Sequence, residues 1–243
     1  MGHLNVKHIA SSAALRLALA DAATPQVCHC PLKVSVAAVL LAAGAGTRMG
    51  YKAKSLLELD GVPLIRRQIM VLQSAGVTEL VVVLGHHASE IAPLLKDFAV
   101  SLVINPNPDA SPISSQRLGL QNLSGQTDAV LMALADQPLI DAQDVRQLMD
   151  AFMQRPENTV LLFPRVHGQP GNPVVFTAQV RTDILACPPE VGCKQWRQQH
   201  APQVHAFDCD NTHFVQDLDT PEDIEKLRFS SGRQLQWPTP TLP

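Results

Sequence analysis

The chain has 243 residues, and its 19 Lys or Arg and 22 Asp or Glu residues give a formal net charge of -3 at pH 7. This length suits one α/β domain, and a hydrophobic content of 46% excludes general disorder. No apolar run reaches the roughly 18 residues of a membrane span. The slightly acidic balance and the 4% aromatic content give no basis for nucleic-acid binding. The odd count of five cysteines argues against a secreted disulfide framework, so we expect a cytoplasmic protein that contacts neither membrane nor nucleic acid.

The two ends of the chain differ in composition from the middle. Residues 1–33 contain an Ala- and Leu-rich stretch, but its apolar run is broken by Arg16 and is poor for secretion. Residues 230–243 hold three of the 19 prolines, a composition typical of an extended tail. We therefore predict a flexible N-terminal extension at 1–33, one folded domain at 34–229 and a Pro-rich tail at 230–243.

Strand and helix patterns alternate along the predicted domain. Residues 34–41 form a continuous apolar run, which indicates a strand buried on both faces, and residues 64–75 fit a helix that Gly76 would cap. The same reasoning predicts strands at 80–84, 100–104 and 129–134 and helices at 88–96, 113–122 and 141–154.

The second half is less regular. Strands are expected at 159–163, 173–176 and 203–208, with a loop at 164–172, and Thr220 and Pro221 open a final helix. Strands that alternate with helices of these lengths predict an α/β fold of three layers, in which a mostly parallel sheet is flanked by helices.

A glycine-rich turn follows the first predicted strand. Residues 41–50 read LAAGAGTRMG and are followed by Lys52 and Lys54. Small residues after a strand let the backbone approach a ligand closely, and their N–H groups can hold phosphate oxygens, to which Arg48 and Lys54 would add positive charge. The spacing fits neither the dinucleotide fingerprint GxGxxG nor the P-loop GxxxxGK[ST]. An ordinary βα turn that is merely rich in glycine is the structural alternative.

The full pattern of this turn is more specific than its glycines. The string L-A-A-G-x-G-x-R-M-G, with a lysine four residues later, resembles the signature of the MobA-like nucleotidyltransferases, and the resemblance extends over residues 34–228. It implies a Rossmann-like fold similar to that of nucleotide-diphospho-sugar transferases, with Arg48 and Lys54 in catalytic roles. The implied nucleotide-binding residues are Leu41, Ala42, Ala43, Gly44, Gly46, Arg48, Lys54, Ser114, Ser115 and Asp136.

Two acidic motifs follow later in the chain. Asp136 comes directly after the strand at 129–134, where an acid of an open α/β sheet points into the ligand crevice and can bind Mg²⁺. An aspartate that caps the next turn is the alternative. Residues 217–223, DLDTPED, resemble the final motif of the family, and the resemblance implies Mg²⁺ as the cofactor, held by Asp136 and Asp217. Asp219 is an alternative to Asp217 as the second metal ligand, because residues two positions apart face the same side of an extended segment.

Two further segments resemble family motifs. Ser114 and Ser115 begin a predicted helix, where their hydroxyl groups can contact a nucleoside or simply cap the helix. Residues 168–173, GQPGNP, resemble the acceptor loop, which implies that Gly171, Asn172 and Pro173 contact the acceptor. A Gly- and Pro-rich hairpin explains that composition equally well.

The chain also departs from the family pattern. Gln116 stands before Arg117 where a leucine is usual, so the resemblance assigns no role to Arg117. Cys193 and Lys194 are departures in a segment linked to acceptor recognition. Neighbouring histidines at 86 and 87 have no acid or nucleophile at a recognisable spacing and are interpreted as structural.

The resemblance finally implies a reaction. Ala42-Ala43-Gly44 looks like the cytidylyltransferase branch, whereas the guanylyltransferase branch tends toward Ala-Gly-Gly. The expected reaction moves CMP from CTP to the phosphate of molybdenum-molybdopterin, which forms the cytosine dinucleotide cofactor and releases pyrophosphate. The expected partners are CTP, a molybdopterin-type acceptor and a downstream molybdoenzyme or its chaperone. Transfer to another phosphate acceptor such as a sugar 1-phosphate, and a non-catalytic carrier of the cofactor, are the alternatives. A dehydrogenase is less favoured because the dinucleotide fingerprint is broken.

Overall fold

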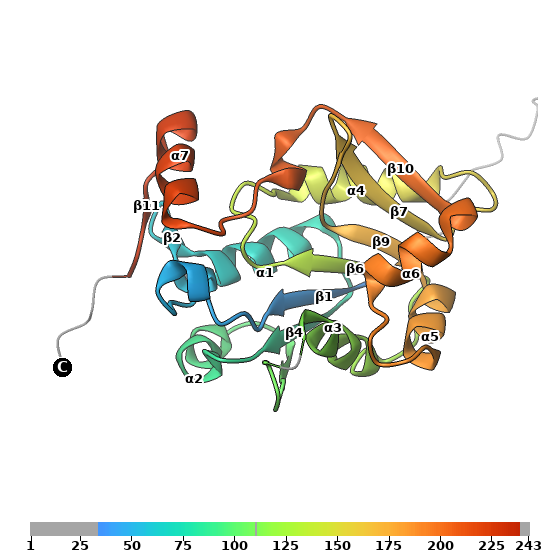
Figure 1. The fold of residues 1–243 in the computed structure, drawn as a ribbon, viewed down its shortest axis with the longest axis horizontal. Helices are drawn as coiled ribbons and strands as arrows, with labels where there is room; N and C mark the ends of the chain where they lie inside the picture. The colour runs from blue at the N-terminus through green and yellow to red at the C-terminus, as the bar shows by residue number, and fades with distance from the viewer. Residues whose placement is uncertain (1–33, 110, 239–243) are drawn as a thin grey trace, which may run out of the picture. The chain divides into compact units, whose positions relative to one another are not determined.

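The computed structural model describes residues 34–109 and 111–238, so the predicted extension at 1–33 and the end of the predicted tail lie outside the described residues. The main sheet runs in the order β10-β7-β9-β6-β1-β4-β5, and β8 pairs with β7 (Figure 1). Its strands are β1 (Val36–Ala42), β4 (Glu79–Leu84), β5 (Ser101–Ile104), β6 (Ala129–Leu134), β7 (Leu161–Val166), β8 (Gln169–Pro170), β9 (Val174–Thr177) and β10 (Val204–Cys209). Only β8 and β9 run antiparallel to their neighbours in this sheet.

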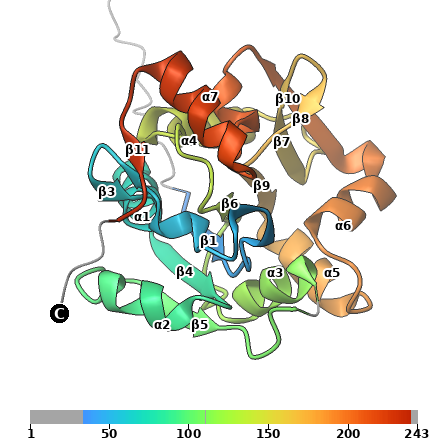
Figure 2. The ribbon, with the colours of Figure 1, turned by 60° about the vertical axis from the view of Figure 1, so that its left-hand side comes forward.

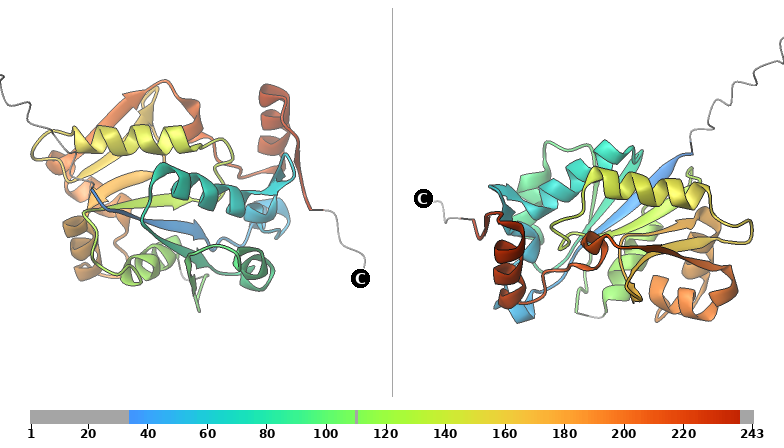
Figure 3. Two further views of the ribbon diagram at one scale, coloured as in Figure 1. Left: turned by 180° about the vertical axis from the view of Figure 1, so that it is seen from behind. Right: turned by 90° about the horizontal axis from the view of Figure 1, so that it is seen from above.

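Helices cover both faces of the main sheet (Figures 1 and 3). One face carries α1 (Leu64–Ala75) and α4 (Ala142–Met153), and the other carries α3 (Pro112–Gln121) and α5 (Ala178–Ala186). Successive residues of β1 alternate between the two cores. Ala38 and Leu40 pack under α1 and α4, whereas Ala37 and Val39 pack under α3 and α5. This doubly buried strand confirms the predicted three-layer α/β fold with a mostly parallel sheet.

A small second sheet lies beside the glycine-rich turn. It contains β2 (Glu58–Leu59), β3 (Val62–Pro63) and β11 (Leu235–Gln236), and helix α7 (Pro221–Ser231) precedes β11 (Figure 2). A third apolar cluster joins Met49 of the turn to Leu59, Leu218, Leu227 and Leu235. The folded chain therefore continues beyond residue 229, where the predicted domain ends.

Several expected elements differ in detail. The predicted helix at 88–96 is one α-helical turn, α2 (Ala88–Ile91), followed by a 3-10 turn at Ala92–Leu95, because Pro93 has no N–H group to continue the α-helical ladder. The predicted loop at 164–172 is largely a hairpin of β7 and β8. Helices α5 and α6 (Cys193–Gln199) were not predicted. None of the helices in the described part of the chain is long and apolar enough to cross a membrane.

Candidate active site

Three cavities lie at the carboxyl ends of β1 and β6, the edge at which open α/β sheets bind ligands. The loop cavity, about 100 Å³, is lined by Gly44, Lys54 and Asp136 among others. The middle cavity, about 250 Å³, shares Gly44 and Asp136 with it and adds Ala43 and Ser115. The outer cavity, about 240 Å³, shares Gln116 and Leu134 with the middle cavity. The three cavities therefore adjoin one another, beginning at the glycine-rich turn, and together we call them the cleft.

The glycine-rich turn has the geometry of an anion cradle. Gly46 has a φ of 64°, and a Cβ atom there would collide with the carbonyl oxygen of Lys52. Within the described residues, the N–H groups of Gly44, Ala45 and Gly46 donate to no protein acceptor. His87 contacts the turn, because its Nε2 lies 3.2 Å from the carbonyl oxygen of Ala45. The turn can thus present free amides to phosphate oxygens, as its residue types suggested.

Lys54 is the centre of a charged network. Its Nζ lies 2.6 Å from Asp136 Oδ2 and 2.8 Å from Asp219 Oδ1, and Arg48 reaches the second oxygen of Asp219 at 2.8 Å. Burial by itself lowers the pKa of Lys54, but attraction by Asp136 and Asp219 outweighs burial and raises it. Hydrogen bonding from Lys54 keeps the pKa of Asp219 below its usual value. The structure therefore brings together Arg48, Lys54 and Asp136, and it adds Asp219 to them.

Asp217 lies next to this network without a cationic partner of its own. Its Oδ1 is buried and has no hydrogen-bond partner among the described residues. Burial, followed by repulsion from Asp136, raises the pKa of Asp217 to about 6. A buried carboxylate oxygen without a donor is costly unless a cation or a proton satisfies it. The hard oxygen donors of Asp136 and Asp217 thus fit a divalent cation.

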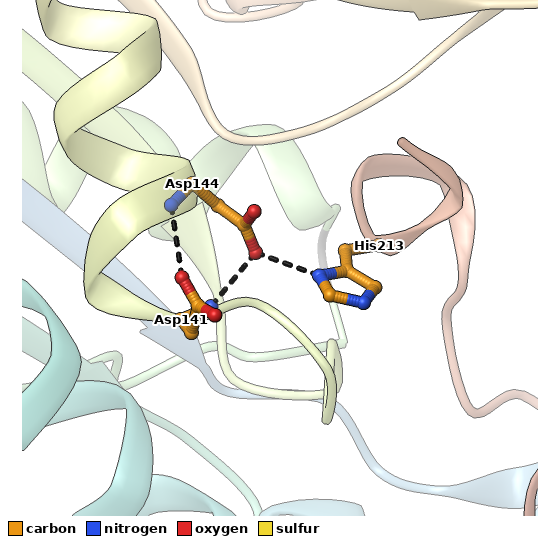
Figure 4. A group of neighbouring side chains, drawn as sticks. All are labelled: Asp141, Asp144 and His213. Atoms are coloured by element: carbon orange, nitrogen blue, oxygen red, sulfur yellow. Dashed lines mark hydrogen bonds and ion pairs between the residues drawn. The ribbon is translucent and has the colours of Figure 1, made fainter. Parts of the chain in front are cut away.

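Another group has closer metal-ligand spacing but a structural role. Asp141, Asp144 and His213 are the one trio in the described chain whose donor atoms all lie within 4.8 Å of one another (Figure 4). Asp141 caps α4 by accepting from Asp144 N at 2.9 Å. Asp144 accepts from Asp141 N at 3.0 Å, His213 Nδ1 at 2.8 Å and Asn211 Nδ2 at 2.6 Å. Because these oxygens already have donors, the trio acts as a clamp between α4 and the segment that leads to Asp217.

The serine motif is organised by a residue that the sequence analysis did not single out. Asn105, buried at the end of β5, donates from Nδ2 to the hydroxyl oxygens of Ser114 and Ser115, each at 2.9 Å. Ser111 rather than Ser114 caps α3, because its Oγ accepts from Ile113 N at 2.9 Å. Ser115 lines the middle cavity, and the neighbouring Ser114 accepts a hydrogen bond from the same asparagine. The signal that could have indicated Asn105 is its position directly after a predicted strand.

Gln116 and Arg117 have different roles. The Arg117 guanidinium donates to the carbonyl oxygens of Leu185 at 3.0 Å and Val191 at 3.3 Å, so it joins α5 to the segment before α6. Gln116 lines both the middle and outer cavities, and its Oε1 accepts from Cys193 N at 3.1 Å. Gln116, which departs from the family pattern, is therefore the residue that faces the cleft.

The acceptor loop lines the outer cavity. Gly171 and Asn172 border it, and the N–H of Asn172 donates to the carbonyl oxygen of Phe214 at 2.9 Å. Pro173 directly precedes β9 and does not line the cavity. Cys193 also borders it, but burial raises the pKa of this thiol to about 12. It remains protonated near neutral pH and cannot act as a thiolate nucleophile.

Comparison with known proteins identifies the family. A model described as the MobA-like NTP transferase domain matches residues 38–204, most of the described chain. The chain belongs to this family. A relative described as "Nicotine blue oxidoreductase" from Paenarthrobacter nicotinovorans is 29% identical over 199 residues, which cover 79% of this chain and 96% of the relative.

Two further matches are a shorter one in sequence and a more distant one in structure. The bifunctional protein GlmU of Clavibacter sepedonicus is 28% identical over 61% of this chain, and the chain spans only 31% of that protein. Among solved structures, a nucleotidyl transferase from Methanothermobacter thermautotroptrophicus superimposes with a TM-score of 0.65 at 22% identity, covering 80% of this chain and 96% of the other. The fold is therefore that of the nucleotidyltransferases of the nucleotide-diphospho-sugar transferase type.

Proposed function

We propose that the protein transfers CMP from CTP to the phosphate of molybdenum-molybdopterin and releases pyrophosphate. The observation that carries a nucleotidyl transfer is the network around Lys54, in which Asp136, Asp219 and Arg48 lie at the end of a turn with free amides. Transfer of a phosphoryl-type group depends mostly on positioning and on neutralising charge, and this cluster provides both cations and metal-binding oxygens. No general base is needed when the nucleophile is already a phosphate anion.

In this proposal the glycine-rich turn holds the triphosphate. The amides of Gly44 to Gly46 would donate to phosphate oxygens, and Arg48 and Lys54 would stabilise the charge that develops on the leaving pyrophosphate. Asp136 and Asp217 would hold Mg²⁺, which would neutralise phosphate charge when bound. Lys54 also limits the repulsion between Asp136 and Asp219.

The preference for CTP rests on Ala43. This residue lines the middle cavity, as Ser115 does, and a side chain at Gly85 would collide with it. A methyl group at position 43 takes space that glycine would leave to a larger base. The size of the cavity wall therefore favours a pyrimidine, in agreement with the resemblance of Ala42-Ala43-Gly44 to the cytidylyltransferase branch.

The test is pyrophosphate release with Mg²⁺ and molybdenum-molybdopterin, comparing CTP, GTP, ATP and UTP. We expect release with CTP. Release with GTP instead would move the protein to the guanylyltransferase branch. CTP turnover that requires a sugar 1-phosphate and ignores molybdopterin would replace the acceptor, and tight cofactor binding without any release would make the protein a carrier.

A second candidate is an oxidoreductase. It is favoured by the name of the Paenarthrobacter relative, nicotine blue oxidoreductase, which matches 79% of this chain. The broken dinucleotide fingerprint at Met49 and Gly50 argues against it. Consumption of NADH or NADPH with a dye acceptor, in the absence of pyrophosphate release from any nucleotide, would select this candidate.

A further inference from the structure

Arg197 is a half-buried cation without an acceptor. Arg67, Arg117, Arg155 and Arg181 are also partly buried, and each donates to at least one backbone carbonyl oxygen. Within the described chain, Arg197 forms neither an ion pair nor a side-chain hydrogen bond, and it contacts the Phe163 ring at 4.2 Å from the ring centroid. A guanidinium has five N–H donors, so partial burial without a protein acceptor carries a cost. An anionic ligand at this position would remove that cost.

Lys194 points to the same kind of ligand. It stands three residues before Arg197 on α6, so both side chains lie on one side of the helix, and both line the outer cavity. Lys194 likewise has no carboxylate partner among the described residues, and no acidic side chain lines this cavity. The outer cavity is therefore lined by two cationic side chains and by no acidic one.

The remaining walls describe the rest of the ligand. Met132, Leu134, Leu161 and Val174 provide apolar surface, while Gln116 and Asn172 provide amide groups at the rim. Asp136 lines the loop and middle cavities but not the outer one. An anion at Lys194 and Arg197 is thus separate from the phosphate that would react beside Asp136.

We propose that Lys194 and Arg197 form an oxyanion-binding site for a second anionic group of the acceptor. The assignment of this ligand as the acceptor rests on the proposed function, whereas oxyanion binding does not. Such a site selects acceptors that carry two separated anionic regions. Molybdopterin carrying molybdenum has a second anionic region in its metal–oxygen group, and the 1-phosphate of a neutral sugar has none.

The test uses the full-length chain and two oxyanion probes, inorganic phosphate and molybdate, followed by residue-resolved NMR. We expect both probes to shift the amide signals of Asn172 and Cys193, which border the outer cavity. The double variant Lys194→Gln/Arg197→Gln should weaken this response about tenfold or more, because two charge-assisted contacts are lost. Arg197→Lys should retain most of it. Shifts from molybdate alone would assign the site to the metal–oxygen group, and equal shifts from both would assign it to oxyanions generally.

A matched control is Arg165→Gln. Arg165 lies near Arg197 in the neighbouring groove but is already paired with Asp208 at 2.6 Å, so its neutralisation should leave the response unchanged. Shifts confined to Gly44 and Gly46, or an unchanged response in the double variant, would overturn the proposal. Because no nucleotide is present, this outcome is independent of whether CMP transfer occurs. If transfer occurs, the double variant should raise the KM for molybdopterin and leave the KM for CTP unchanged.

Discussion

The backbone N–H of Leu218 donates to the carbonyl oxygen of Asp136 at 3.0 Å. The side chain of Leu218 is fully buried, so the segment on either side of it is held against the end of β6. Gln137 reinforces the attachment, because its Nε2 donates to the carbonyl oxygen of Phe214 at 3.1 Å. Two acidic motifs far apart in the sequence become one cluster through these backbone contacts, with Asp217 and Asp219 on the two sides of Leu218.

Replacing Lys54 by alanine should remove the proposed transfer activity. The variant leaves Asp136 and Asp219 without the cation that joins them, and it removes one positive charge from the triphosphate site. We expect a loss of at least about 10² to 10³ in kcat, as for the removal of a single stabilising donor. Pyrophosphate release is the measurement, and Lys226→Ala on exposed α7 is the matched control. Full activity of Lys54→Ala would remove this residue from the mechanism.

Asp217→Asn should stabilise the protein at neutral pH in the presence of EDTA. The folded-state pKa of Asp217, about 6, lies above its ordinary value of 3.8. The folded state therefore holds this proton more tightly than the unfolded state. The stabilisation from Asp217 is complete below pH 3.8 and is lost as pH rises through 6. Asparagine does not ionise and so does not lose this stabilisation. The free energy of unfolding of the variant at pH 7 should therefore exceed that of the wild type by about 2–3 kcal/mol, with little difference near pH 4.

Denaturant unfolding at the two pH values measures this effect, and adding Mg²⁺ extends it. Mg²⁺ should stabilise the wild type and have a smaller effect on Asp217→Asn, because the variant lacks one anionic ligand. The same experiment on Asp219→Asn separates the two candidates for the second metal ligand. Equal stabilities of wild type and Asp217→Asn at pH 7 would contradict the raised pKa of this carboxyl group.

Ala43→Gly should relax the choice of base. Removing the methyl group should enlarge the middle cavity, which Ser115 also lines, so kcat/KM for GTP should rise relative to that for CTP. One methyl group in a pocket is worth about 10-fold or more in kcat/KM discrimination. Ala45→Gly is the matched control, because Ala45 lies in the same turn but does not line that cavity. An identical shift in both variants would indicate a general effect of turn flexibility rather than the pocket wall.

Local sequence patterns predicted much of the fold. Helix α1 and its Gly76 cap, and strand β6, match the predicted ranges because apolar spacing and capping residues act within a few turns. Helices α5 and α6 were missed because short segments of mixed polarity take their helical form from packing around Trp196 and Ile184.

The candidate site was predictable only in part. The position of Asp136 follows from its place directly after a strand, because the residues that follow the strands of a parallel sheet lie at its ligand-binding edge. The ion pairs of Lys54 with Asp136 and Asp219 depend on how distant segments pack, which local patterns do not encode. The same holds for Gln116, because only the packing of α3 against α5 and α6 decides which of two adjacent polar residues reaches the cleft.

Arg117→Ala and Gln116→Ala should therefore have different effects. Arg117→Ala removes the donor to the carbonyl oxygens of Leu185 in α5 and Val191 before α6, so the free energy of unfolding should fall by about 2–4 kcal/mol. Gln116→Ala removes one contact to Cys193 N and a polar wall of two cavities, so it should cost about 1 kcal/mol and mainly raise the KM values. Urea unfolding and steady-state kinetics on both variants measure the contrast. A stable Arg117→Ala protein with altered substrate binding would reverse the two roles, and would place Arg117 rather than Gln116 at the cleft.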